Sequence, residues 1–376
     1  MKLLVVVGTR PEAIKLAPVV AEARARGCDV DVCATAQHRG MLDQVLDLFG
    51  IEPDYDLDLM TPNQTLSSLT ARALTAVDDV VEKVRPDWLV VQGDTTTAMV
   101  AALAAFYRKV PVAHVEAGLR TLDLAHPFPE ELNRIIADRV STAHFVPTPS
   151  SAENLRREGF AQDTLYVTGN TVVDALRRIQ ARAEGKPPAD FGVDVAADER
   201  LVLVTAHRRE SFGEGLRSIA RALMKIAASH DDVRIVYPVH PNPNVREVME
   251  ETLSGAPRIH MIEPLDYDGF VGLMARAHLI LSDSGGVQEE APSLGVPALV
   301  LRTTTERPEA VAAGAVRLVG VDEDTIVEAA RSLLTDADAY ARMAHAVNPY
   351  GDGRASERIV SILLGEPWDA FDSGSS

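Results

Sequence analysis

Short apolar runs alternate with longer, partly polar segments along almost the whole chain. The run 3–7 (Leu-Leu-Val-Val-Val) predicts a strand buried on both faces, and the first strand–turn–helix carries Thr9 and Glu12 as a capping box. Strands are expected at 3–7, 29–34, 88–91, 112–115, 143–146, 165–168, 201–205, 233–236, 259–262, 279–281, 298–301 and 316–318. Helices are expected to end near residues 26 and 49, to span 95–107, 130–139 and 150–158, and to start near 212, 244, 267, 286, 306 and 323. This alternation predicts an α/β protein with doubly wound parallel sheets.

The strand–helix series is interrupted once, at residues 183–199, which are rich in Ala, Pro, Gly and Asp and are expected to form a loop. The series on either side predicts two Rossmann-like domains, 1–168 and 169–354. Ligands of such sheets bind outside the carboxyl ends of the strands, so we expect the two domains to face a shared central cleft.

Composition narrows the range of partners. Of the 376 residues, 46% are apolar and 24% charged, as is ordinary for a globular protein. The net charge of −18 argues against nucleic acid and anionic membrane surfaces as partners. The first apolar run is too short for a signal peptide or a membrane span. Two cysteines, Cys28 and Cys33, accompany no metal-ligand pattern, which predicts no metal site and a reducing, cytoplasmic location.

Ionisable side chains, together with the hydroxyl of Ser284, gather where the predicted strands end. Those of the first half are Arg10, Asp94, His114 and Glu116, with Glu130 and Glu131 after a following loop; those of the second half are His207, Arg208, Arg209, Glu210, His240, Ser284 and Glu290. Each has an ordinary explanation: Asp94 could cap a helix, Glu130 could favour a helix N-terminus, and 207–210 could be a self-paired charge run. Together they exceed what packing requires.

The segment 282–292 predicts a ligand site of defined chemistry. Gly285 and Gly286 open a helix after a buried strand, and free N–H groups at such a point favour an anion, with Ser284 as a further donor. Glu290 suits a ligand with hydroxyl donors, so a nucleotide diphosphate meets both demands. A plain strand-to-helix turn explains the same residues equally well.

Two common nucleotide motifs are absent. The first turn, Gly8-Thr9-Arg10-Pro11-Glu12-Ala13, is not GxGxxG, and no GxxxxGK[ST] occurs. NAD binding and ATP hydrolysis are therefore disfavoured, and no cofactor is expected. Arg10 and Lys15 are expected to contact a ligand near this turn instead.

Several blocks match one family, in order. They are 8–15 (GTRPEAIK), 37–39 (QHR), 93–97 (GDTTT), 114–120 (HVEAGLR), 169–171 (GNT), 207–212 (HRRESF), 240–243 (HPNP), 283–290 (DSGGVQEE), 305–309 (TERPE) and the neighbourhood of 348–353. The chain, from residue 2 to about 353, resembles the non-hydrolysing UDP-N-acetylglucosamine 2-epimerases of bacteria.

The resemblance implies interconversion of UDP-N-acetylglucosamine and UDP-N-acetylmannosamine for surface polysaccharides. It implies a glycosyltransferase-B arrangement, a homodimer, and a C-terminal helix at about 355–364 that returns to the first domain. The family's catalytic residues fall on Asp94, Glu116, Glu130 and His207, and its UDP-sugar contacts on Arg10, Lys15, Ser284, Gly285, Gly286, Glu290 and Arg307. A second UDP-N-acetylglucosamine acts as an activator in this family, which makes Gln37, Arg208 and His240 the expected allosteric contacts.

The chemistry of the sugar agrees with this expectation. The C2 hydrogen has no adjacent carbonyl, so an enzyme without NAD must expel UDP, form a 1,2-unsaturated glycal and add UDP back. Three alternatives remain at this stage: a hydrolysing epimerase that releases N-acetylmannosamine and UDP, a glycosyltransferase of the same fold, and a catalytically silent nucleotide-sugar sensor.

Overall fold

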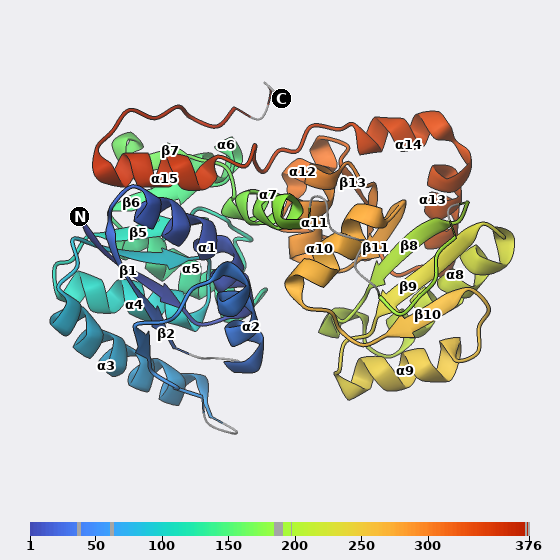
Figure 1. The fold of residues 1–376 in the computed structure, drawn as a ribbon, viewed down its shortest axis with the longest axis horizontal. Helices are drawn as coiled ribbons and strands as arrows, with labels where there is room; N and C mark the ends of the chain where they lie inside the picture. The colour runs from blue at the N-terminus through green and yellow to red at the C-terminus, as the bar shows by residue number, and fades with distance from the viewer. Residues whose placement is uncertain (36–38, 61–63, 184–190, 197, 373, 375–376) are drawn as a thin grey trace. The chain divides into compact units, whose positions relative to one another are not determined.

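The computed structural model describes residues 1–35, 39–60, 64–183, 191–196, 198–372 and 374. The chain forms two compact units. Unit 1 contains Met1–Arg177 and Tyr350–Ser375, and unit 2 contains Arg178–Pro349. Figure 1 shows that each unit is a sheet covered by helices.

Unit 1 contains a parallel sheet of order β3-β2-β1-β4-β5-β6-β7. Its strands are β1 (Lys2–Val7), β2 (Asp29–Ala34), β3 (Tyr55–Asp56), β4 (Trp88–Gln92), β5 (Val112–Val115), β6 (Ala143–Val146) and β7 (Leu165–Val167). Its helices are α1 (Arg10–Ala25), α2 (Arg39–Phe49), α3 (Leu66–Val84), α4 (Thr96–Tyr107), α5 (Glu130–Val140), α6 (Pro149–Arg157), the 3-10 helix η1 (Gln162–Thr164), α7 (Thr171–Ala183) and α15 (Ala355–Leu364).

Unit 2 repeats this architecture with a parallel sheet of order β10-β9-β8-β11-β12-β13. Its strands are β8 (Arg200–Thr205), β9 (Val233–Pro238), β10 (Ile259–Ile262), β11 (Leu279–Ser282), β12 (Ala298–Val300) and β13 (Val316–Leu318). Its helices are η2 (Arg209–Ser211), α8 (Glu214–Ser229), α9 (Pro243–Leu253), α10 (Tyr267–Arg276), α11 (Gly285–Glu290), η3 (Ala291–Leu294), α12 (Pro308–Ala312), α13 (Glu323–Thr335) and α14 (Ala337–Ala344).

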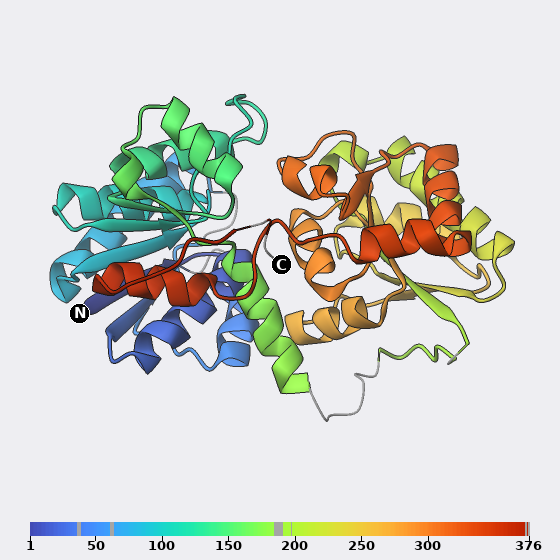
Figure 2. The same ribbon diagram turned by 90° about the horizontal axis from the view of Figure 1, so that it is seen from above.

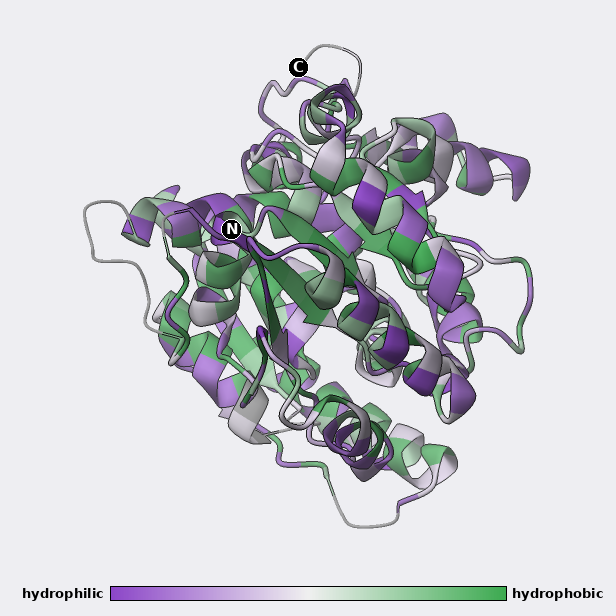
Figure 3. Ribbon diagram, turned by 90° about the vertical axis from the view of Figure 1, so that its right-hand side faces the viewer, coloured by the Kyte–Doolittle hydropathy of each residue, from purple (hydrophilic) through white to green (hydrophobic). Residues whose placement is uncertain are grey.

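The apolar runs form the interior of each sheet, as the sequence predicts. Leu3 to Val7 are at most 2% exposed, because helices cover both faces of a doubly wound sheet. In unit 2, α8 packs on β9 and α13 packs on β12 and on α8. Figure 3 shows the result as hydrophobic strands between helices whose outer faces are largely hydrophilic. The predicted α/β class with two Rossmann-like parallel sheets is therefore confirmed.

The division between the units differs from the predicted boundaries at 168 and 354. Helix α7 begins in unit 1, because Asp174 accepts the backbone N–H groups of Ala355 (3.2 Å) and Ser356 (2.7 Å) and so caps α15. Arg358 adds ion pairs to Asp352 and Asp369. The helix at 355–364 is present as the resemblance implies, and both views place it against the N-terminal elements (Figures 1 and 2).

Three helices, α3, α7 and α14, were not predicted, although α3 has a readable signal. Thr65 accepts the N–H of Ser68, and the buried residues Leu69, Ala73, Val77, Val80 and Val84 recur with helical spacing.

The predicted capping box at the start of α1 is only half correct. Thr9 is the N-cap but its side chain makes no cap bond, whereas Glu12 does reach back to the N–H of Gly8.

Candidate active site

The strand order locates the ligand edge of unit 1. The chain leaves β1 for β2 on one side and returns to β4 on the other, so the switch point lies between β1 and β4. Arg10 and Asp94 follow these two strands, and Glu116 follows the next strand, β5. A Cβ on Gly8 would lie 2.2 Å from Thr97 Oγ1, so only glycine fits where the β1 turn passes α4.

Asp94 does not cap α4, which excludes its ordinary explanation. Thr95 is the N-cap, and its hydroxyl accepts the N–H of Ala98 at 3.0 Å. The Asp94 carboxylate instead pairs with Arg134, and its backbone carbonyl accepts from Asn133 Nδ2 at 2.9 Å. With 29% of its side chain exposed, Asp94 is fixed in place yet reachable from solvent.

Glu116 is buried and surrounded by donors. Lys15 Nζ donates to both carboxylate oxygens at 2.8 and 2.7 Å, Gln92 Nε2 donates to one of them, and Asn170 Nδ2 lies 3.4 Å from the other. The backbone of Glu116 has a φ of 62°, a left-handed conformation that is uncommon for a residue other than glycine. Such strain at a buried carboxylate is typical of functional sites.

The sequence predicts that Lys15 contacts a ligand. In the structure its ammonium group pairs with the carboxylate of Glu116. Its side chain is 9% exposed and that of Glu116 is 5% exposed. The pair joins α1 to the residue that follows β5, and so holds these two parts of unit 1 together at the ligand edge of the sheet.

Two consecutive glutamates at the start of α5 have different surroundings. Glu131 is fully buried, pairs with Arg134 at 2.9 Å and accepts the N–H groups of Thr121 and Leu122, which fixes the loop before the helix. Glu130 is half-buried, and among the described residues no hydrogen bond or ion pair holds its carboxylate. Glu130 is thus the one of the two that is available to a ligand.

His114 supports the site from below. Its Nδ1 lies 2.6 Å from the Asp138 carboxylate and its Nε2 lies 2.8 Å from the carbonyl oxygen of Gly93, the residue before Asp94. Burial, the largest single effect, would lower the pKa of His114, but the charge of Asp138 together with the hydrogen bonds to Asp138 and Gly93 outweighs it, and the pKa is raised. His114 is completely buried, so it positions the Gly93 turn and does not reach a ligand.

Glu12 is a buried carboxyl beside the same turn. Its two oxygens accept the N–H of Gly8 at 3.1 Å and the hydroxyl of Thr95 at 2.6 Å. Burial raises the pKa of Glu12 to about 7, against the opposing effect of these hydrogen bonds. The folded protein therefore holds this proton more tightly than the unfolded chain does.

We expect Glu12→Gln to remove a pH dependence from the stability of unit 1. The contribution of Glu12 is fully present below its unfolded pKa of about 4.5 and is lost as pH rises through 7, so the wild type loses about 2–3 kcal/mol between pH 5 and pH 8 on this account. The variant should not show this loss. Urea unfolding followed by tryptophan fluorescence measures it, since Trp88 and Trp368, the chain's two tryptophans, are both in unit 1. Parallel stability–pH curves would contradict the burial argument.

Unit 2 has its switch point between β8 and β11. Residues Thr205 and Ser282 are paired there, and their hydroxyls are 2.6 Å apart. His207 follows β8 and Asp283 follows β11, so both extend from the ligand edge of this sheet. The His207 ring stacks on His240 with centroids 5.1 Å apart and an interplanar angle of 12°.

The glycine turn after β11 brings a guanidinium group next to helix α11. A Cβ on Gly285 would lie 2.7 Å from Arg307 Nη1, so a side chain there would displace the arginine. Glu289 holds Arg307 at 2.6 Å. Ser284 is the N-cap of α11, but its hydroxyl does not cap the helix. A Cβ on Gly286 would meet nothing closer than 3.6 Å, so packing within the unit does not require glycine there.

Glu290 lies beneath this turn and is buried. Its Oε1 accepts the hydroxyl of Tyr267 at 2.7 Å, which orients the carboxylate from α10. Two turns of unit 2 thus bring together Ser284, Gly285, Gly286, Glu290 and Arg307.

Of the three expected allosteric contacts, the structure describes two. The His240 ring stacks on His207, and Arg208 donates from Nε to the carbonyl of Asp283 at 3.1 Å. Gln37 lies outside the described residues.

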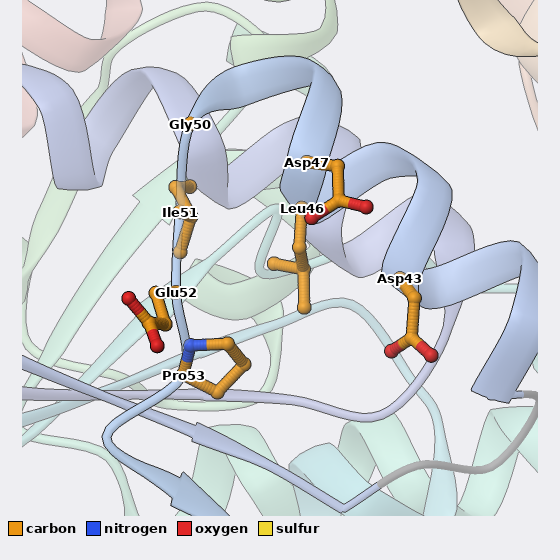
Figure 4. Close-up of a pocket in the computed structure, with 7 residues that line it drawn as sticks. All are labelled: Asp43, Leu46, Asp47, Gly50, Ile51, Glu52 and Pro53. Carbon is orange, nitrogen blue, oxygen red and sulfur yellow. The ribbon is translucent and has the colours of Figure 1, made fainter.

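A hollow of about 450 Å³ lies elsewhere on unit 1, at the C-terminal end of α2 (Figure 4). Its lining combines exposed carboxylates with an apolar floor and consists of Asp43, Leu46, Asp47, Gly50, Ile51, Glu52 and Pro53. This end of α2 leads to the amino end of β3, opposite the strand ends that carry the candidate residues.

Within the described part of the chain, no cluster of three or more His, Cys, Asp or Glu could hold a metal ion, and no helix is long and apolar enough to cross a membrane.

A family model described as UDP-N-acetylglucosamine 2-epimerase matches residues 21–364. The chain belongs to the UDP-N-acetylglucosamine 2-epimerase family. A relative from Escherichia coli (strain K12), described as a UDP-N-acetylglucosamine 2-epimerase, is 52% identical over 96% of this chain and 98% of its own length. A probable UDP-N-acetylglucosamine 2-epimerase of Ralstonia nicotianae is 55% identical over the same shares of the two chains. These matches confirm the epimerase resemblance seen in the sequence blocks.

Solved structures of the 2-epimerase family have the same fold. The enzyme from Neisseria meningitidis, solved with UDP-N-acetylglucosamine bound, has a TM-score of 0.92 and 48% identity, covering 97% of this chain and all of that one. A glycosyltransferase of kitacinnamycin, 12% identical with a TM-score of 0.69, shares the fold alone.

Sequence reasoning about this 2-epimerase family member missed the residues that hold the carboxylates. Arg134, Gln92 and Asn170 contact Asp94 or Glu116 from other elements, and Asp283 contacts the backbone of His207. Asp283 belongs to the block 283–290, but nothing in the sequence indicates that its carboxylate is buried. The spacing of Glu131 and Arg134, three residues apart on α5, was the one readable hint.

Proposed function

We propose that this protein reversibly epimerises UDP-N-acetylglucosamine to UDP-N-acetylmannosamine at C2 without net hydrolysis. The observation that carries the proposal is the family match, which extends across both units and includes a relative solved with UDP-N-acetylglucosamine bound. The site residues support it, because unit 1 supplies carboxylates at its switch point and unit 2 supplies donors suited to a diphosphate.

The mechanism we propose is elimination and re-addition. A carboxylate removes the C2 proton, the C1–O bond breaks with its electron pair on the departing UDP, and 2-acetamidoglucal forms. Re-addition of UDP at C1 with protonation of C2 from the other face gives the epimer. Asp94, Glu116 and Glu130 are assigned to proton transfer. The donors around Glu116 favour its ionised form, which is the form that accepts a proton.

His207 is assigned to the leaving diphosphate, where an imidazolium offsets the negative charge that develops as C1–O breaks. We assign Ser284, the amides of Gly285 and Gly286, and Arg307 to the same diphosphate, and Glu290 to hydroxyl groups of the nucleotide. Arg10 is assigned to the nucleotide as well. Lys15 contributes through Glu116, with which it is paired. Retention of UDP allows the glycal to be recaptured.

We further propose a cytoplasmic homodimer that supplies bacterial surface polysaccharide synthesis and needs no added cofactor. We also propose an activating second UDP-N-acetylglucosamine at Gln37, Arg208 and His240. These assignments rest on the family resemblance, and His240 has a structural link to the catalytic set through its stacking on His207.

Proton NMR of the enzyme with UDP-N-acetylglucosamine in D₂O tests the function. We expect a mixture of the two UDP-sugars with deuterium at C2 of the product, unchanged after dialysis against EDTA and without added NAD. Free N-acetylmannosamine with UDP would identify a hydrolysing epimerase. Retention of the original C2 hydrogen in the product would refute elimination, and an absence of any reaction would refute the proposed activity.

A further inference from the structure

Asp283 is a completely buried carboxylate at the switch point of unit 2. One of its oxygens, Oδ2, accepts two backbone N–H groups, that of His207 at 2.7 Å and that of Arg208 at 2.8 Å. The register that pairs Ser282 with Thr205 creates these contacts, because it brings the residues just beyond the two strands together. Asp283 thereby sets the path of the chain that carries His207.

The other oxygen, Oδ1, is buried and has no hydrogen-bond partner among the described residues. It lies 3.4 Å from Nδ1 of His207. A buried carboxylate oxygen without a donor carries an uncompensated desolvation cost, which a proton on Nδ1 would relieve after a small approach of the ring.

The other described groups around His207 do not offer an acceptor for a proton on its Nδ1. His240 stacks on the ring, and its pKa is lowered by burial first and by the neighbouring His207 second. Tyr237 donates its hydroxyl to the carbonyl of Ala206 at 2.6 Å. Arg208 donates from Nε to the backbone carbonyl of Asp283. Asp283 is the carboxylate that the structure places beside the ring.

We propose that Asp283 is a positioning residue that holds a proton on Nδ1 of His207 and leaves Nε2 to donate to the departing diphosphate. The proposal rests on the proposed function of His207. As C1–O breaks, its electron pair stays on the diphosphate oxygen and the Nε2 proton moves toward that oxygen; on re-addition the proton returns to Nε2. The negative charge of Asp283 favours the doubly protonated ring throughout.

Asp283→Asn tests the proposal with little change of shape. The amide oxygen can still accept the N–H groups of His207 and Arg208, while an NH₂ group replaces Oδ1. We expect kcat to fall by at least about 10-fold with KM changed much less, and the alkaline limb of the kcat–pH profile to move to lower pH because a negative charge beside the ring is removed. A fall in kcat without movement of this limb would mean a merely structural role and would overturn the proposal.

His207→Asn provides the matched background. In that variant Asp283→Asn should cause little further loss of kcat, since both substitutions act through one ring. Independent, additive losses would contradict the proposal.

Nitrogen-15 NMR of the histidine rings separates this proposal from the proposed function, because it needs no turnover. The His207 signals are assigned by their loss in His207→Asn. In the wild type, neutral His207 should carry its proton on Nδ1, whereas in Asp283→Asn this preference should be lost. A wild-type ring protonated on Nε2 alone when neutral would overturn the proposal even if the enzyme is an active epimerase, and this result needs no folded variant at position 283.

Discussion

Glu130→Gln is expected to lower kcat by at least about 10²-fold while leaving the stability of unit 1 unchanged. The substitution keeps the shape of the side chain and removes its capacity to transfer a proton. Among the described residues no hydrogen bond or ion pair engages the Glu130 carboxylate, so the fold loses nothing larger than a helix-dipole contact. Epimerisation rates by NMR and urea unfolding by tryptophan fluorescence give the two quantities.

The neighbouring residue provides a matched control. Glu131→Gln makes the same chemical change at the next residue. The Glu131 carboxylate pairs with Arg134 and accepts the N–H groups of Thr121 and Leu122, so the substitution removes a charge that the fold uses. Because Glu131 is fully buried, its loss should cost about 3–5 kcal/mol of stability. A Glu130→Gln enzyme with near-normal kcat would return Glu130 to the role of an acidic residue at a helix N-terminus.

Hydrophobic periodicity predicted every strand of the described chain except the two-residue edge strand β3 (Tyr55–Asp56), because the other strands lie in sheets that are buried on both faces. The predicted strands 29–34, 112–115, 143–146, 259–262 and 316–318 agree with the structure at both ends. The residues at the strand ends followed from this, since a parallel sheet brings its carboxyl ends to one edge. The units were harder to delimit, because Asp174 and Arg358 tie the two chain crossings to unit 1 through contacts about 180 and 190 residues apart.

The partners of the carboxylates could not be predicted in the same way. Lys15 and Glu116 are 101 residues apart, and Gln92 and Asn170 approach Glu116 from two further segments. A basic residue near a glycine turn reads as a ligand contact in the sequence, because the sequence carries no information on which distant carboxylate lies opposite it. The positive φ of Glu116 is likewise invisible in the sequence, since glutamate is not a residue that indicates a left-handed conformation.

Substitutions in the buried ion pair of Lys15 and Glu116 are expected to lower both stability and turnover. Lys15→Met is expected to destabilise unit 1 by about 3–5 kcal/mol, because it removes the cation that is paired with the buried Glu116 carboxylate. Glu116→Gln should also be destabilising, because it removes the carboxylate that is paired with the buried Lys15 ammonium. Both single variants should lose at least about 10²-fold in kcat, since Glu116 then lacks either its charge or the lysine that holds it in place.

The double variant Lys15→Met/Glu116→Gln separates stability from chemistry. With neither charge left to bury, it should be more stable than either single variant, with a coupling free energy of about 2 kcal/mol or more, yet remain as inactive as Glu116→Gln. That outcome would show that the pair is kept for the reaction, since a fold without it is adequately stable. Urea unfolding followed through Trp88 and Trp368 reports on the unit that contains the pair. Strictly additive losses of stability would mean that the two side chains do not depend on one another, and recovery of turnover in the double variant would remove Glu116 from the proton-transfer set.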